Sequence, residues 1–148
     1  MGWWLLAAVA ASMISSQIVG FLWYGPLFGK IWMKEMGWET LTKQEMEEKQ
    51  KAAIPGYITG ALLGAAATAL LWLMLVTWDF HGQAMSDLHA VGAGALLGLM
   101  AWAIGYVPGT ATSRFFEGQS WTLWAIGASY WGILAVLWGV YVGVFSTL

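Results

Sequence analysis

Four long apolar runs without any aspartate, glutamate, lysine, arginine or histidine limit what this chain can fold into. They cover residues 3–24, 53–78, 90–112 and 121–145. About 20 consecutive apolar residues are enough for a helix to cross the hydrocarbon core of a bilayer. The runs lack the alternating pattern of a membrane β-barrel, and helices satisfy their own backbone polar groups in lipid. We therefore predict an all-α fold, a four-transmembrane-helix bundle that forms a single integral membrane domain over residues 1–148.

The composition agrees with a membrane protein and excludes several classes of function. Of the 148 residues, 59% are hydrophobic and 9% are charged, which is outside the range of soluble globular domains. A net charge of -2 indicates no nucleic acid or other polyanionic partner. The absence of cysteine excludes thiolate metal sites, cysteine nucleophiles and redox dithiols.

The positive charges are distributed unevenly among the three links between the runs. The first link, residues 25–51, contains five lysines, the third contains Arg114, and the second, residues 79–89, has no lysine or arginine. By the positive-inside rule, we expect residues 25–51 and 113–120 in the cytoplasm and both termini outside, in a cell inner membrane. The first run lacks a preceding basic region, so we expect a retained span rather than a cleaved signal peptide.

The first link is polar enough to carry a helix of its own. Thr42 and Glu45 have the spacing of a capping box, in which each side chain bonds to the other residue's backbone N–H at the start of a helix. Lysines and glutamates four residues apart follow this pair. We predict a short polar or amphipathic cytoplasmic helix between the first two spans, with Pro55 in the first turn of the second span.

Glycines spaced four residues apart recur in three of the predicted spans. They are Gly56, Gly60 and Gly64 in the second span, Gly94 and Gly98 in the third, and Gly139 and Gly143 in the fourth. In lipid, helices associate through close packing at such small residues, because apolar burial between helices gives little net drive. The stripes predict a compact bundle. Spacing alone does not decide whether a stripe packs within one chain or between protomers.

The first span carries a polar cluster of Ser12, Ser15, Ser16 and Gln17. Helical spacing places the three serines on a shared face, with Gln17 at the edge of the cluster. One interpretation is structural, with hydrogen bonds to neighbouring helices or to the backbone. The other is a stripe that is lined with water or contacts a solute.

Two proline motifs and one loop leave further alternatives. Tyr24-Gly25-Pro26 and Tyr106-Val107-Pro108 indicate either two helix-pair repeats or two helix terminators or kinks. Arg114 and Glu117 have the spacing of an ion pair that closes a cytoplasmic turn.

The outer loop combines two carboxylates with two imidazoles, which can ligate a metal or haem but also serve as ordinary polar loop residues. These four are Asp79, His81, Asp87 and His89.

The sequence offers no catalytic constellation and no dedicated metal motif. A carboxylate, histidine or lysine in the middle of a span, which a proton relay or an ion-coupled carrier needs, is missing from all four runs. We therefore predict no catalytic residue, no metal ligand and no cofactor. A lipid, a quinone or an apolar pigment bound against the deeper tryptophans stays open. These tryptophans are Trp72, Trp102, Trp131 and Trp138.

Two stretches of the chain resemble the recurrent regions of a known family. The first is LWYGPLFGK at residues 22–30, followed by Trp32-Met33. The second comprises residues 116–118 and Ala128-Ser129-Tyr130-Trp131. They resemble a bacterial family of small four-helix membrane proteins labelled as a domain of unknown function. The resemblance implies a four-helix integral membrane domain. The family pattern includes no catalytic residues, and the loop with the aspartates and histidines is not part of it.

These observations favour a non-enzymatic multi-pass membrane protein that acts through helix packing, through oligomerisation or as an accessory subunit. Its expected partners are the lipid bilayer and a homo-oligomer or membrane-protein complex. One alternative is a passive channel or carrier for a small neutral solute, built on the face from Ser12 to Gln17. Another is a metal-binding or haem-binding subunit built on the outer loop. The sequence identifies no solute, partner or oligomer number.

Overall fold

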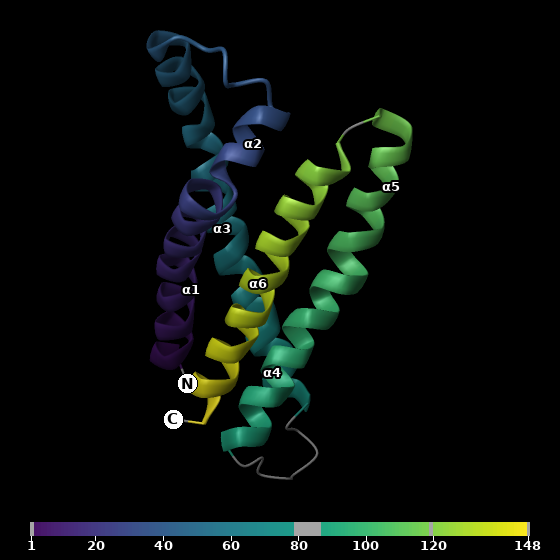
Figure 1. The fold of residues 1–148 in the computed structure, drawn as a ribbon. Helices are drawn as coiled ribbons and strands as arrows, with labels where there is room; N and C mark the ends of the chain where they lie inside the picture. Colours follow the sequence, from purple (N-terminus) through teal and green to yellow (C-terminus); the bar gives the residue numbers. More distant parts are fainter. Residues whose placement is uncertain (1, 79–86, 119, 148) are drawn as a thin grey trace.

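The computed structural model describes residues 2–78, 87–118 and 120–147, and all of their regular structure is helical (Figure 1). The elements are α1 (Gly2–Leu22), the π-helical segment η1 (Trp23–Leu27), α2 (Gly29–Glu35), α3 (Lys43–Trp78), α4 (Asp87–Ala101), the π-helical segment η3 (Trp102–Tyr106), α5 (Val107–Glu117) and α6 (Trp121–Ser146).

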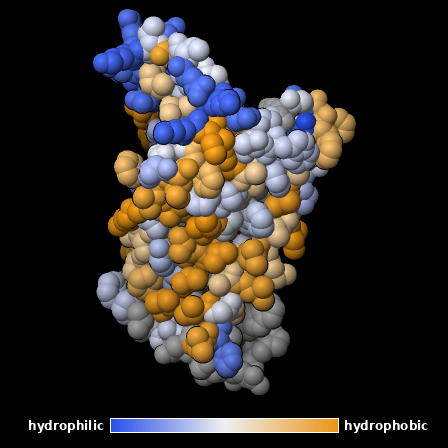
Figure 2. All heavy atoms as spheres, in the orientation of Figure 1, coloured by the Kyte–Doolittle hydropathy of each residue, from blue (hydrophilic) through white to orange (hydrophobic). Residues whose placement is uncertain are grey.

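Within the described residues, four helices are long and apolar enough to cross a membrane, as predicted from the sequence. They cover Trp3–Leu27, Lys43–Leu75, Leu88–Glu117 and Trp121–Ser146. Figure 2 shows hydrophobic surface over the middle of the molecule and hydrophilic surface at the end where α3 begins. We call this end, which carries α2 and the start of α3, the lysine-rich end. Both termini lie at the opposite end of the bundle (Figure 1).

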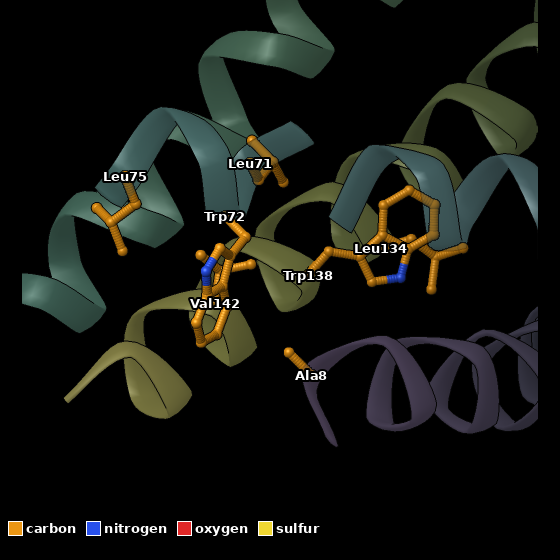
Figure 3. Packing of buried hydrophobic residues seen from close by; sticks show 7 residues of the cluster. All are labelled: Ala8, Leu71, Trp72, Leu75, Leu134, Trp138 and Val142. Atoms are coloured by element: carbon orange, nitrogen blue, oxygen red, sulfur yellow. The ribbon is translucent and has the colours of Figure 1, made fainter. Parts of the chain in front are cut away.

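Helix α6 is the centre of the bundle, because it contacts α1, α3 and α4 (Figure 1). Seven buried apolar residues from α1, α3 and α6 form the core between these helices (Figure 3). They are Ala8, Leu71, Trp72, Leu75, Leu134, Trp138 and Val142. The core therefore contains two of the deep tryptophans, which pack against aliphatic side chains.

The closest approach between two helices is the α4–α6 seam, which is formed by Gly94, Gly98, Gly139 and Gly143. A β-carbon added at Gly94 would lie 2.1 Å from the Gly139 carbonyl oxygen, and one added at Gly139 would lie 1.9 Å from the Gly94 carbonyl oxygen. Gly98 approaches the Ala135 carbonyl in the same way. The backbones touch here because these residues have no side chain. The predicted close packing of the third and fourth spans is thus confirmed.

The second span differs from its prediction. α3 is one continuous helix of 36 residues that begins at Lys43, so the polar helix is the first part of the span rather than a separate element. Lysine, glutamine and glutamate are strong helix formers, which favours this extension. Pro55 lies inside α3 and not in its first turn. It removes the donor for the Lys51 carbonyl, which lies near the aqueous end of the span, where water can replace that donor.

The first link also contains an element that we did not predict. The short helix α2 follows the first span directly, and residues 36–42 connect it to α3. The predicted capping box at the start of α3 is confirmed. The Thr42 backbone N–H donates to Glu45 Oε2 at 2.8 Å, and the Glu45 backbone N–H donates to Thr42 Oγ1 at 3.3 Å.

Candidate functional site

The first of the two stretches that resemble the family packs against α6, next to the part of the second stretch that lies in α6. The indole N–H of Trp23, the first residue of η1, donates to the Ile126 carbonyl oxygen at 2.9 Å. The indole N–H of Trp102, the first residue of η3, donates to the Ala128 carbonyl oxygen at 2.9 Å. Both π-helical segments are therefore fixed to the same two turns of α6. A π-helical turn is wider than an α-helical one, and such turns often accompany a kink.

Aromatic rings fill the space around these two bonds. The Tyr24 ring packs edge-on against Tyr130 of α6, with 5.3 Å between the ring centroids. It also contacts Trp32 of α2 at 5.8 Å. Tyr106 of η3 lies 6.3 Å from Trp131 of α6. Aromatic pairs at such distances are favourable beyond their buried area. We call the set of Trp23, Tyr24, Trp102, Tyr106, Tyr130 and Trp131 the aromatic joint.

One glycine of the first stretch has a steric role in this joint. A β-carbon added at Gly29 would lie 2.6 Å from the Tyr24 carbonyl oxygen. Gly29 is buried, so any larger residue would push α2 away from η1. The joint therefore joins three of the four spans through packing and indole hydrogen bonds. This arrangement positions the helices relative to one another.

The proline motifs lie beside the π-helical segments. Pro26 is inside η1, and Pro108 immediately follows the first residue of α5. Pro108 does not terminate the third span, because α5 continues to Glu117. Pro26 lies closer to a helix end, since the helical path of the first span stops at Phe28. Whether the two motifs mark an internal repeat stays a prediction.

The polar cluster of the first span is divided by the structure. Ser12 and Ser16 are buried, and both donate to carbonyl oxygens of their own helix, at 2.7 Å and 2.6 Å. Ser16 Oγ also accepts a hydrogen bond from the indole N–H of Trp138 at 3.3 Å. These contacts support the structural interpretation for the serines. Gln17 is exposed on the outside of the bundle, so it does not share their environment.

The second span contains a long segment that packs weakly against its own chain. Between residues 43 and 63 of α3 no residue is buried, and only four are half-buried. We call residues 43–63 the unpacked half of α3. Burial begins at Gly64, where an added β-carbon would lie 2.9 Å from the Trp138 ring. The rest of α3 then contributes Leu71, Trp72 and Leu75 to the core.

The glycine stripe of α3 is therefore only partly used within the chain. The Trp138 ring occupies the space beside Gly64, but a β-carbon added at Gly56 or Gly60 would meet nothing within 4 Å. Gly64 thus leaves room for an aromatic side chain rather than for the backbone of another helix. The other two glycines face open space on the unpacked half of α3.

The outer loop lies largely outside the described residues, including Asp79 and His81. Asp87 is the first residue of α4, and His89 is exposed in its first turn. Among the residues that the structure describes, no group of three or more histidines and acidic residues is placed to hold a metal ion. Arg114 and Glu117 both lie near the end of α5, and the ion pair between them stays a prediction.

Comparison with known proteins identifies a family. No curated protein and no solved structure matches the chain. The sequence model of one family, described as a protein of unknown function (DUF1761), matches residues 7–143. This match covers all four membrane-crossing helices almost completely. The chain therefore belongs to the DUF1761 family of proteins of unknown function.

Proposed function

We propose that this protein is a non-enzymatic membrane protein that acts by associating with another copy of itself in the bilayer, through the unpacked half of α3. One observation carries the proposal. Gly56 and Gly60 have the spacing that lets helices approach closely, yet nothing in the described chain occupies the space beside them. Because lipid provides little drive for ordinary apolar contact, small residues with an open face favour a helix as their neighbour.

The charges of the unpacked half allow two copies to meet. Its aqueous part, residues 43–51, contains three lysines and three glutamates. Opposite charges lie four residues apart and the segment has no net charge, so an identical segment brings no net repulsion. A two-fold interface uses the same patch on both copies, which requires this kind of self-complementarity.

A second open glycine pair provides a matched comparison. Gly105 and Gly109 are also four residues apart, and an added β-carbon at either would meet nothing within 4 Å. They flank Pro108 at the junction of η3 and α5, where several neighbouring residues are half-buried. The helix is not regular there, so a partner helix cannot follow both glycines as closely.

The alternative functions gain less support from the geometry. A solute path along the first span needs free hydroxyls, but those of Ser12 and Ser16 already donate within the chain. A metal-binding subunit needs a cluster of ligands, for which the described residues offer no support. We also propose an inner-membrane location with the lysine-rich end in the cytoplasm and both termini outside, on the basis of the lysine distribution.

Native mass spectrometry in a mild detergent tests the proposed association. We expect the wild type to be a dimer or larger assembly and Gly60→Leu to be mainly monomeric, because a leucine side chain would keep a partner helix at a distance. Gly109→Leu is the matched control and should assemble like the wild type. A wild type that is monomeric at all concentrations, or equal loss in both variants, would contradict the proposal.

A further inference from the structure

The first membrane-crossing helix carries an amide side chain, Gln17, near the middle of its span. Gln17 is exposed on α1, whose membrane-crossing part covers Trp3–Leu27. The central residue of this range is Ser15, so Gln17 lies only about 3 Å along the axis from the middle. The headgroup region begins about 15 Å from the middle of the bilayer. A glutamine side chain is far too short to reach it.

The amide of Gln17 has no hydrogen-bond partner among the residues that the structure describes. Two other exposed polar residues of the membrane-crossing helices, Thr77 and Ser129, behave differently. Thr77 Oγ1 donates to the Leu73 carbonyl at 2.8 Å, and Ser129 Oγ donates to the Ala125 carbonyl at 2.6 Å. Short hydroxyl side chains satisfy themselves on their own helix in this way. Gln17 makes no such bond, and an unpaired amide in hydrocarbon is costly.

We infer that the Gln17 side chain hydrogen-bonds to Gln17 of a second copy of this chain. A carboxamide has both N–H donors and a carbonyl acceptor, so two of them related by a two-fold axis can form two reciprocal hydrogen bonds without a third group. The residues around Gln17 on the exposed face of α1 carry no charge and do not oppose such contact. They are Leu6, Ala10, Met13, Ile14 and Phe21.

The position of α1 in the bundle is compatible with this contact. α1 packs against α3 and α6, and Figure 1 shows it at the edge of the bundle away from α4 and α5. Its buried face, which includes Ala8, Ser12 and Ser16, is directed into the core. Gln17 lies on the other face. The contact therefore adds a partner surface without disturbing the internal packing of α1.

This inference rests on the proposed self-association, but it does not depend on the α3 contact. In lipid, hydrogen bonds between polar side chains contribute to helix association. The Gln17 pair would fix the register of the two copies at one depth of the membrane, because a shift along the axis separates the two amides. The glycines let the two helices approach closely, whereas the amide pair fixes how the two copies are aligned along the membrane normal.

Energy transfer between donor-labelled and acceptor-labelled protein in vesicles of phosphatidylethanolamine and phosphatidylglycerol tests the inference. We expect Gln17→Leu to weaken association by roughly 3- to 30-fold, the range given by the measured strength of such bonds. Gln17→Asn should retain part of the affinity. Ile18→Leu, which changes the adjacent exposed residue without removing a polar group, should associate like the wild type.

The outcomes separate this inference from the proposed function. Wild-type affinity in Gln17→Leu together with weakened association in Gly60→Leu would overturn the role of Gln17 and leave the α3 contact standing. A monomeric wild type would overturn both. Leucine suits a lipid-facing position, so the thermal unfolding midpoint of Gln17→Leu should equal that of the wild type. As a second readout, oxidation of Gln17→Cys should give a disulfide-linked dimer, whereas the exposed α4 variant Leu96→Cys should give none.

Discussion

Two glycine stripes with the same spacing have opposite surroundings in this bundle. In the α4–α6 seam, each glycine faces a backbone atom of the other helix at a distance that excludes any side chain. On the unpacked half of α3, Gly56 and Gly60 face open space. Small residues thus permit close approach but do not specify the partner. The seam determines how the chain folds, and we propose that the open stripe determines how folded chains meet.

The two stripes should differ most in how much folding stability is lost when one of their glycines is replaced by a larger residue. We expect Gly139→Leu to destabilise the bundle strongly, because its β-carbon alone would lie 1.9 Å from the Gly94 carbonyl oxygen and the nearest atoms are all backbone. The loss should be roughly 3 kcal/mol or more, at or above the usual cost of overpacking. Thermal unfolding in detergent measures it. Gly56→Leu should unfold like the wild type, and equal destabilisation would remove the distinction between the stripes.

Trp138 of α6 lies where the packed part of α3 begins, and its substitution tests the assigned core. This residue is 5% exposed, packs over Gly64 and donates to Ser16 of α1. We expect Trp138→Ala to cost roughly 3–5 kcal/mol of folding free energy, the range for truncation of a buried tryptophan. Trp3 is 65% exposed, so Trp3→Ala should cost much less. Chemical unfolding of both variants tests this order, and similar losses would contradict the assigned core.

The aromatic joint should contribute a smaller amount. Trp23→Phe keeps an aromatic ring but removes the N–H that donates to the Ile126 carbonyl. We expect a loss of about 1 kcal/mol, the net value of an ordinary hydrogen bond. Trp102→Phe should give a similar loss, because its bond to Ala128 has the same length. Unfolding midpoints report both values, and wild-type stability in both variants would show that the indole bonds do not secure the π-helical segments.

The capping box should have the smallest and most local effect. Thr42→Ala removes the hydroxyl that accepts from the Glu45 backbone N–H and donates to its carboxylate. We expect faster amide exchange in the first turn of α3 and an unchanged unfolding midpoint, since residues 43–51 do not pack against the core. Hydrogen exchange followed by mass spectrometry resolves this turn. A change that spreads into the core would show that the unpacked half is coupled to the fold.

The sequence predicts the spans well because membrane crossing depends on length and local polarity. It predicts that Gly94, Gly98, Gly139 and Gly143 pack closely, but not that these glycines face each other. The choice of partner depends on the whole bundle and has no local signal. For the same reason, Gly56 and Gly60 could not be distinguished from Gly64. The interior position of Pro55 was also missed, because the strong helix formers before it outweigh the proline.

The candidate site could be predicted only in part. The two stretches stand out in the sequence and supply four of the six residues of the aromatic joint, whereas Trp102 and Tyr106 lie in neither stretch. The bond from Trp23 to Ile126 joins residues about a hundred positions apart. The indole bonds of Trp23 and Trp102 were not anticipated. Each tryptophan precedes a proline by a few residues, which is the one local signal for a π-helical segment. The polar cluster was identified correctly, but its division between buried serines and exposed Gln17 depends on where α3 and α6 lie.

Cysteine cross-linking in intact membranes tests the central claim most directly, because the chain contains no cysteine of its own. Single variants Gly60→Cys and Gly109→Cys place a thiol on the two open glycine surfaces at comparable cost to the fold. We expect Gly60→Cys to form a disulfide-linked dimer under mild oxidation and Gly109→Cys to stay monomeric. No cross-link at position 60, or equal cross-linking at both positions, would contradict association through the unpacked half of α3.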